Sequence, residues 1–214
     1  EAPPPEKIPD VSKAALLIFS GLFKKIVLAS LLFEHGVSDT FSSPMDFSSA
    51  GLWGAMIGYT IQLYCDFSGY TDMARGFSLL LGIHLPENFR SPYIATNLGD
   101  FWQRWHITFS QWLRDYIYIP LGGSRRSKWR VSWNLFLTFL FCGLWHGASW
   151  GFILWGGIHG IGLAAHKQNR DRMRARGEDP SLAGRPAMKC IGWLYTFSFV
   201  SMSRVVFQSP DLDT

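Results

Sequence analysis

VSWNLFLTFLFCGLWHGASWGFILWGGIHGIGLAAH, residues 131–166, is an apolar stretch without a single Lys, Arg, Asp or Glu. A helix needs roughly 20 apolar residues to cross a hydrocarbon layer about 30 Å thick. The stretch is too long for one membrane-spanning helix and therefore predicts two. Glycines recur in it at a four-residue spacing that lets helices pack closely in lipid. They form two runs: Gly143, Gly147 and Gly151, then Gly156 and Gly160.

His146 lies near the middle of this stretch. Charging an imidazole in apolar surroundings is costly, so we expect it to be sequestered and neutral, which is the form a general base needs. An ionisable side chain at membrane depth is a functional hypothesis by default. The residues alone leave a purely structural histidine open as the alternative.

Three further apolar segments, 14–33, 48–65 and 188–207, alternate with short blocks of charge. Two basic blocks, 125–130 and 167–176, flank the central stretch, and the positive-inside rule assigns both to the cytoplasmic side. Because much of the positive charge is concentrated in these blocks, the net charge of +4 does not indicate nucleic-acid binding. We therefore predict an all-α, multi-pass membrane protein surrounded by lipid.

Two residue pairs in the first apolar segments bear on helix packing. Lys24 and Lys25 interrupt the first segment, so we expect them to lie at an interface or to face protein or water rather than lipid. Gly54 and Gly58 in the second segment have the spacing of closely packed membrane helices.

The chain between the second segment and the central stretch predicts short or re-entrant elements. Pro86 and Pro92 break helix continuation and predict a loop or elbow. Residues 98–118 carry apolar side chains on one helical face and polar ones on the other, which predicts one amphipathic helix. His106 lies on the apolar face of this predicted helix. Two interpretations are open: it is a residue of the functional site, or it is a buried histidine with satisfied hydrogen bonds.

The segment YCDFSGYTDMARG, residues 64–76, gathers polar groups directly after an apolar span. Its carboxylates are Asp66 and Asp72, with Arg75 as a candidate counter-ion; the alternative is that they mark where a helix leaves the membrane. Ser68 and Tyr70 are nearby hydrogen-bonding groups. The three cysteines form no zinc-ligand spacing, and we expect no metal site.

Three motifs carry a resemblance to a known family. They are QLYCDFSGYTDMARGFSLLLGIHLPENFRSPY (62–93), DFWQRWHITFSQWLRDYIYIPLGG (100–123) and GLWHGASWGFILWGGIHG (143–160). In this order they resemble the membrane-bound O-acyltransferase family, above all the bacterial branch that O-acetylates alginate and related exopolysaccharides. The resemblance covers about 13–209, so we expect a single membrane domain between loops at 1–12 and 210–214, as the central fragment of a longer protein.

The resemblance implies roles for particular residues. The WHG histidine of the family corresponds to His146 as the catalytic residue, and the RWH histidine to His106 as the second member of the site. We expect seven further residues to bind substrate or to line the tunnel: Asp66, Ser68, Tyr70, Asp72, Arg104, Trp105 and Trp145.

The resemblance also implies the reaction and its setting. Relatives move an acyl group from a cytoplasmic thioester to a hydroxyl through a tunnel across the membrane. We expect acetyl-coenzyme A as the donor substrate, no bound cofactor, a polysaccharide acceptor such as alginate, and an extracytoplasmic partner protein that finishes the transfer. The expected location is the cell inner membrane. D-alanyl transfer, as in the more distant teichoic acid enzymes, and a membrane transporter or channel remain alternatives.

One segment departs from the family pattern. In FSFVSMSRVVFQSPD, relatives usually carry Trp near the position of Arg204 and Arg near that of Gln208. An arginine in a membrane helix is costly unless it is paired or reaches the interface. This puts the local packing in doubt and leaves both histidine motifs unchanged.

Overall fold

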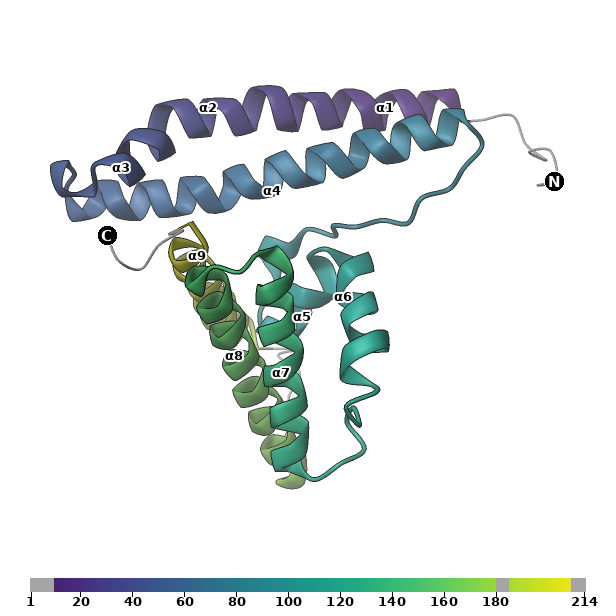
Figure 1. Cartoon of the computed structure of the whole chain (residues 1–214), viewed down its shortest axis with the longest axis vertical. Coiled ribbons are helices and arrows are strands. Elements are labelled where there is room, and N and C mark those ends of the chain that lie inside the picture. The colour runs from purple at the N-terminus through teal and green to yellow at the C-terminus, as the bar shows by residue number, and fades with distance from the viewer. Residues whose placement is uncertain (1–9, 180–184, 209–214) are drawn as a thin grey trace. The chain divides into compact units, whose positions relative to one another are not determined.

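The computed structural model describes residues 10–179 and 185–208, and within these ranges every regular element is helical (Figure 1). The predicted all-α class is thus confirmed for the described chain. Its internal contacts form two compact units, one extending to Asn88 and the other beginning at Phe89. The single membrane domain expected over 13–209 stays a prediction.

The N-terminal unit is a hairpin of two long helical arms (Figure 1). The first arm is a run of α-helices joined by π-helical turns: α1 (Val11–Leu22), η1 (Phe23–Ala29), α2 (Ser30–Leu32), η2 (Phe33–Val37) and α3 (Ser38–Ser42). After a 3₁₀ turn, η3 (Pro44–Asp46), the chain returns as α4 (Ser49–Leu80). Asp10 and Ser48 cap α1 and α4 by accepting backbone N–H groups.

Small residues let the two arms of this hairpin touch backbone to backbone. A Cβ added to Gly21 would lie 2.6 Å from the carbonyl oxygen of Gly69, and one added to Gly76 would lie 2.8 Å from that of Ala14. The prediction for Gly54 was wrong, because a Cβ there would meet nothing within 4 Å. The close approach therefore depends on glycines that the four-residue pattern did not single out.

Ion pairs join the same two arms. The Lys24 ammonium lies 2.5 Å from the Asp72 carboxylate, which also contacts Arg75 at 3.4 Å, and Lys25 pairs with Asp66. Of the alternatives expected for the two lysines, the structure shows the one in which they face protein. Since α4 continues to Leu80, the two aspartates lie inside a helix, and the alternative that they mark where it leaves the membrane stays a prediction.

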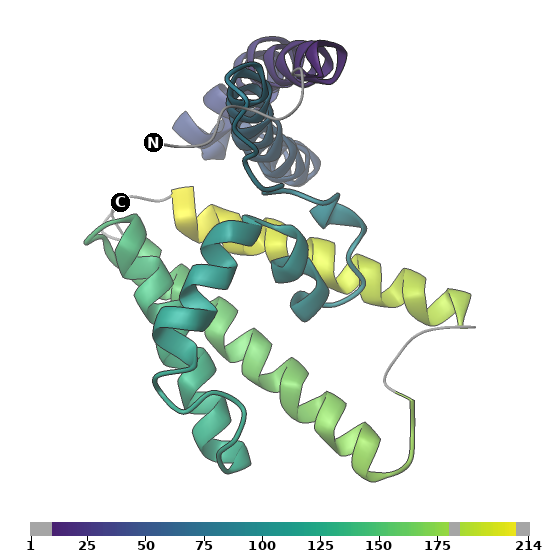
Figure 2. The same cartoon turned by 90° about the vertical axis from the view of Figure 1, so that its right-hand side faces the viewer.

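The C-terminal unit begins with short elements and continues as three long helices. The short elements are η4 (Pro92–Ile94), α5 (Leu98–Arg104), α6 (Ile107–Leu113) and η5 (Arg114–Tyr118). The long helices are α7 (Lys128–His146), α8 (Trp150–Ala175) and α9 (Pro186–Gln208). Figure 2 shows α8 in green and α9 in yellow, close together at one end and diverging toward the other.

The helices α7 and α8 form the predicted pair and touch through glycine. A Cβ added to Gly143 would lie 2.2 Å from the carbonyl oxygen of Phe152, and one added to Gly156 would lie 2.3 Å from that of Phe139. Between the helices, Gly147 has a φ of 154°, a region that favours glycine. The close packing predicted from this pattern is confirmed at Gly143 and Gly156.

The single amphipathic helix predicted over 98–118 was wrong. The chain leaves the helix at Trp105 and His106, restarts as α6, and ends as the π-helical turn η5. The amide of Arg90 donates to the carbonyl of Arg104 at 2.9 Å, so a neighbouring loop takes over hydrogen bonding where α5 stops. The irregular chain before Pro92 agrees with the predicted loop.

Two described stretches are long and apolar enough to span a membrane: Val11–Ser42 and Pro186–Gln208. The helices α4, α7 and α8 are less apolar than these two stretches. Their aromatic and glycine residues score low on such scales, although tryptophan favours the membrane interface. Their crossing of the membrane, and hence the multi-pass topology, stays a prediction.

Adjacent glycines on α8 allow a matched test of the α7–α8 contact. We expect Gly156→Ala to lower the thermal unfolding temperature of the detergent-solubilised protein, because its Cβ would meet the Phe139 carbonyl at 2.3 Å. Gly157→Ala should leave it unchanged or raise it, because that Cβ would meet only the Phe136 ring at 3.7 Å and alanine favours a helix over glycine. Equal effects of the two substitutions would contradict the proposed backbone contact.

Candidate active site

His146 is the last residue of α7, and aromatic side chains from two other helices contact it. Its ring centroid lies 5.4 Å from that of Trp155 on α8 and 5.0 Å from that of Phe207 on α9, both edge to face. The residue as a whole is nevertheless exposed. The predicted sequestration therefore holds only for the faces of the ring that these aromatic residues contact.

His106 has a left-handed backbone between α5 and α6, with φ 44° and ψ 56°. This conformation costs a non-glycine residue on the order of 1–3 kcal/mol and persists where surrounding bonds impose it. Ser110 supplies two of these bonds: its hydroxyl donates to the carbonyl of Trp105 at 3.1 Å, and its amide to that of His106 at 2.9 Å. The backbone thus sets the direction of the His106 side chain.

Aromatic contacts join the two histidines, although 40 positions separate them in the sequence. His106 lies 5.0 Å from Phe109, Phe109 lies 4.4 Å from Trp145, and Trp145 lies 5.0 Å from His146, between ring centroids. Burial lowers the pKa of His106 to about 4, and the nearby His146 acts in the same direction. His106 is therefore neutral at pH 7. We call this set the His106–His146 cluster: His106, Phe109, Trp145, His146, Trp155 and Phe207.

A chain of hydrogen bonds behind the cluster fixes the tautomer of His159. Its Nδ1 accepts from the indole N–H of Trp102 at 3.3 Å, and its Nε2 lies 2.9 Å from the Ser203 hydroxyl. Because that hydroxyl donates to the carbonyl of Val200 at 2.8 Å, Nε2–H is the donor to it. The side chain is 1% exposed. This neutral ring joins α5, α8 and α9 by hydrogen bonds between helices.

Arg204 of α9 points into the protein. It is 4% exposed, and its guanidinium carbon lies 4.4 Å from the ring centroid of Trp105, a cation–π contact. The doubt about packing in this segment is thus answered by a buried position over an aromatic face. Trp105 itself is buried and immediately precedes His106.

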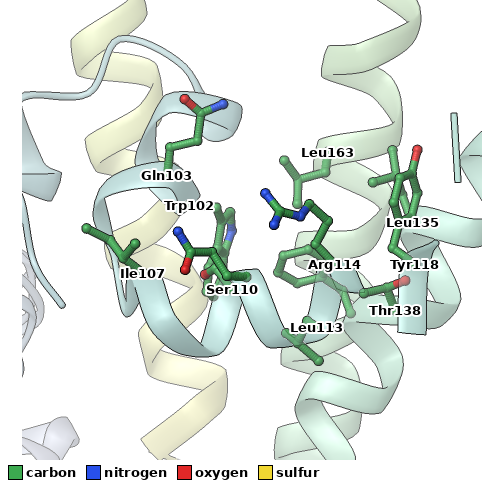
Figure 3. Close-up of a pocket in the computed structure, with 12 residues that line it drawn as sticks. Trp102, Gln103, Ile107, Ser110, Leu113, Arg114, Tyr118, Leu135, Thr138 and Leu163 are labelled. Atoms are coloured by element: carbon green, nitrogen blue, oxygen red, sulfur yellow. The ribbon is translucent and has the colours of Figure 1, made fainter. Parts of the chain in front are cut away.

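A pocket of about 400 Å³ opens beside α5 and α6 (Figure 3). Trp102 and Ile107 line it together with Phe139 of α7. Polar side chains also reach it, among them Gln103 and Arg114. Since Ile107 follows His106 directly, the pocket adjoins the His106–His146 cluster and gives a small molecule room near it.

The remaining predicted site residues have mainly structural contacts. Arg104 pairs with Asp100 at 2.7 Å and donates to the carbonyl of Arg90 at 3.3 Å, which braces the end of α5. In the N-terminal unit, Ser68 is buried and Tyr70 is exposed, while Asp66 and Asp72 form the ion pairs described above. The tunnel-lining role of this set, including Trp105 and Trp145, stays a prediction.

Within residues 10–179 and 185–208, no three or more His, Cys, Asp or Glu side chains come together in a way that could hold a metal ion. Cys65 and Cys142 are buried free thiols, and Cys190 is an exposed one.

Two residues of the site were not identified from the sequence. Phe207 contacts His146, and Trp102 both lines the pocket and binds His159. Both are aromatic residues in apolar segments, where a packing role is the ordinary expectation. No sequence signal separated them from the many other aromatic residues of the chain.

The hydrogen bond from Trp102 to His159 predicts a stability effect. Trp102→Phe keeps an aromatic ring but leaves the buried Nδ1 of His159 without its donor, which costs about 1–3 kcal/mol. The thermal unfolding temperature of Trp102→Phe in detergent should be clearly lower than that of Trp129→Phe, which makes the same change at an exposed position. A Trp102→Phe protein as stable as this control would exclude the proposed contribution.

Comparison with known proteins adds evidence that the geometry alone does not give. Residues 8–207 match the family model described as the membrane-bound O-acyltransferase family. A Helicobacter pylori protein named "Peptidoglycan O-acetyltransferase" is 44% identical over 200 residues, which cover 93% of this chain and 36% of that protein. A Pseudomonas aeruginosa protein named "Probable alginate O-acetylase AlgI" is 41% identical over 192 residues, which cover 90% of this chain and 35% of that protein.

A third relative, the "Teichoic acid D-alanyltransferase" of Bacillus subtilis, is 40% identical over 113 residues, which cover 50% of this chain and 29% of that protein. The chain thus spans about a third of the length of the curated relatives it matches. Because the family model covers nearly all of its residues, the chain belongs to the membrane-bound O-acyltransferase family.

Proposed function

We propose that these residues form the catalytic core of a multi-pass O-acetyltransferase of the inner membrane. The donor is a cytoplasmic thioester, acetyl-coenzyme A, and the acceptor is a hydroxyl group of an extracytoplasmic polysaccharide such as alginate. An extracytoplasmic partner protein completes the transfer. The family assignment and the names of the relatives, which refer to acetylation of peptidoglycan and alginate, support the reaction class.

The observation that carries the proposal is the proximity of two motif histidines. His106 at a strained break and His146 at a helix end belong to one aromatic cluster, joined through Phe109 and Trp145. Strained backbone is concentrated at functional sites, where it fixes a side chain for chemistry. The aromatic rings around both imidazoles exclude water from part of their surface, and the pocket lined by Ile107, the residue after His106, gives a substrate room nearby.

In the proposed reaction His146 is the general base. It takes the proton of the acceptor hydroxyl while that oxygen attacks the thioester carbonyl carbon, and the carbonyl electron pair moves onto its oxygen. The tetrahedral intermediate then collapses, expels the thiolate and leaves the acetyl ester, and the thiolate takes the proton from His146. General base catalysis of this kind contributes typically 10²–10⁴-fold. His106 orients the acceptor or the donor.

D-alanyl transfer is the second candidate. Its support is the similarity to two proteins named "Teichoic acid D-alanyltransferase", 40% and 30% identical to this chain. Both reactions transfer an acyl group from a thioester, so the same histidines serve either. Supplying the full-length protein with acetyl-coenzyme A or with a D-alanyl thioester distinguishes them by which acyl group becomes attached to the polymer.

His146→Ala in the full-length protein should abolish polymer acetylation while the protein still accumulates in the membrane. The reason is that the base is lost, whereas the ring lies at an exposed helix end where its loss leaves no closed cavity. Acetate released from the polymer by mild alkali measures the product. His84→Ala, at an exposed histidine outside the cluster, is the control. Acetylation at the wild-type level in His146→Ala would refute the mechanism.

His106 can be tested separately from its backbone. His106→Ala and His106→Asn should both reduce turnover strongly, by about 100-fold if the imidazole acts in the reaction. Asparagine tolerates the left-handed conformation better than alanine, so His106→Asn should unfold at the higher temperature of the two. If His106→Asn keeps the wild-type turnover, His106 takes no part in the reaction and serves only the backbone conformation between α5 and α6.

A further inference from the structure

We propose that Arg204 stabilises the negative charge that forms on the acyl carbonyl oxygen during transfer. The inference rests on the proposed acyltransferase function and adds a residue that neither histidine motif contains. It assigns a catalytic role to the position where the sequence departs from the family pattern.

The position of Arg204 is the first support. Arginine has a long side chain, and from the last turns of an apolar helix it can reach the interface. Here the residue is 4% exposed, and its guanidinium carbon lies 4.4 Å from the ring centroid of Trp105, the residue before His106. Burying a guanidinium in this way is costly, and intramembrane charges that persist mark functional sites.

The second support is the relation of Arg204 to His146. Phe207 follows Arg204 by three positions on α9, so the two share a helix face, and its ring lies 5.0 Å from that of His146. One face of α9 therefore brings a fixed positive charge near the imidazole that takes the proton and near the break that holds His106.

The positive charge of Arg204 stabilises the state formed during the reaction more than it stabilises the unreacted site. When the hydroxyl oxygen bonds to the carbonyl carbon and its proton moves to His146, an oxyanion and an imidazolium form together. A guanidinium beside the oxyanion lowers the energy of this state more than that of the neutral substrates, which is the requirement for catalysis.

The test uses the full-length protein and compares three replacements. Arg204→Gln removes the charge, and we expect kcat for acetyl transfer to fall about 100-fold while KM for donor and acceptor changes little. Arg204→Lys keeps a charge with a different geometry and should recover part of this loss. Lys189→Gln removes one charge from an exposed position of the same helix and should leave kcat unchanged.

Chemical rescue separates charge from packing. In Arg204→Ala, low millimolar guanidinium should restore part of kcat, whereas urea, which has nearly the same shape without the charge, should not. Restoration by both compounds would identify a packing role and overturn the proposal. So would failure of all three Arg204 replacements to accumulate, because it would show that the residue serves folding.

A phosphate-free donor separates the carbonyl oxygen from the phosphates of coenzyme A. With S-acetyl-N-acetylcysteamine, Arg204→Gln should show the same fall in kcat as with acetyl-coenzyme A. A defect seen only in KM for acetyl-coenzyme A would place Arg204 at the phosphates and overturn the proposal. If Arg204→Gln keeps the wild-type kcat, the role of Arg204 is overturned and the proposed function stands. If the wild-type protein transfers no acyl group, both the role of Arg204 and the proposed function are overturned.

Discussion

The backbone contact between α7 and α8 at Gly143 and Gly156 is the constraint on which the candidate site depends. With any side chain at these positions the helices would be forced apart, because a Cβ would come within 2.4 Å of a facing carbonyl oxygen. Their close approach brings the end of α7, where His146 lies, against the first turns of α8. Trp155 and His159 follow there at a spacing of four and so face the same side.

Around this pair of helices the chain combines imidazoles with the buried guanidinium of Arg204. His159 is held neutral by bonds that leave it only one tautomer, and Trp102 connects it to α5. The break after α5 then directs His106, and Arg204 packs over the residue before it. The chain belongs to the membrane-bound O-acyltransferase family, and in the reaction proposed for it hydroxyl attack on a thioester needs a base and a site for developing negative charge.

Much of this was predictable because the signals are local. Glycine spacing predicted the α7–α8 contact, and a lysine pair in an apolar segment predicted side chains that avoid lipid, which Lys24 and Lys25 do by pairing with aspartates. The break at His106 was not predictable, since neither glycine nor proline marks it and the bonds that impose it come from Ser110 and a distant loop. Gly54 failed for a related reason: helical spacing shows which residues share a face, but not which face meets another helix.

The stoichiometry of transfer tests this chemistry most directly, measured for the full-length protein together with its extracytoplasmic partner in proteoliposomes, with acetyl-coenzyme A on one side and the polysaccharide on the other. The account predicts that one free thiol appears in the donor compartment for each ester formed on the polymer, and that both stop when His146 is replaced. Thiol release without ester formation, or passage of a solute across the bilayer without a new covalent bond, would contradict it.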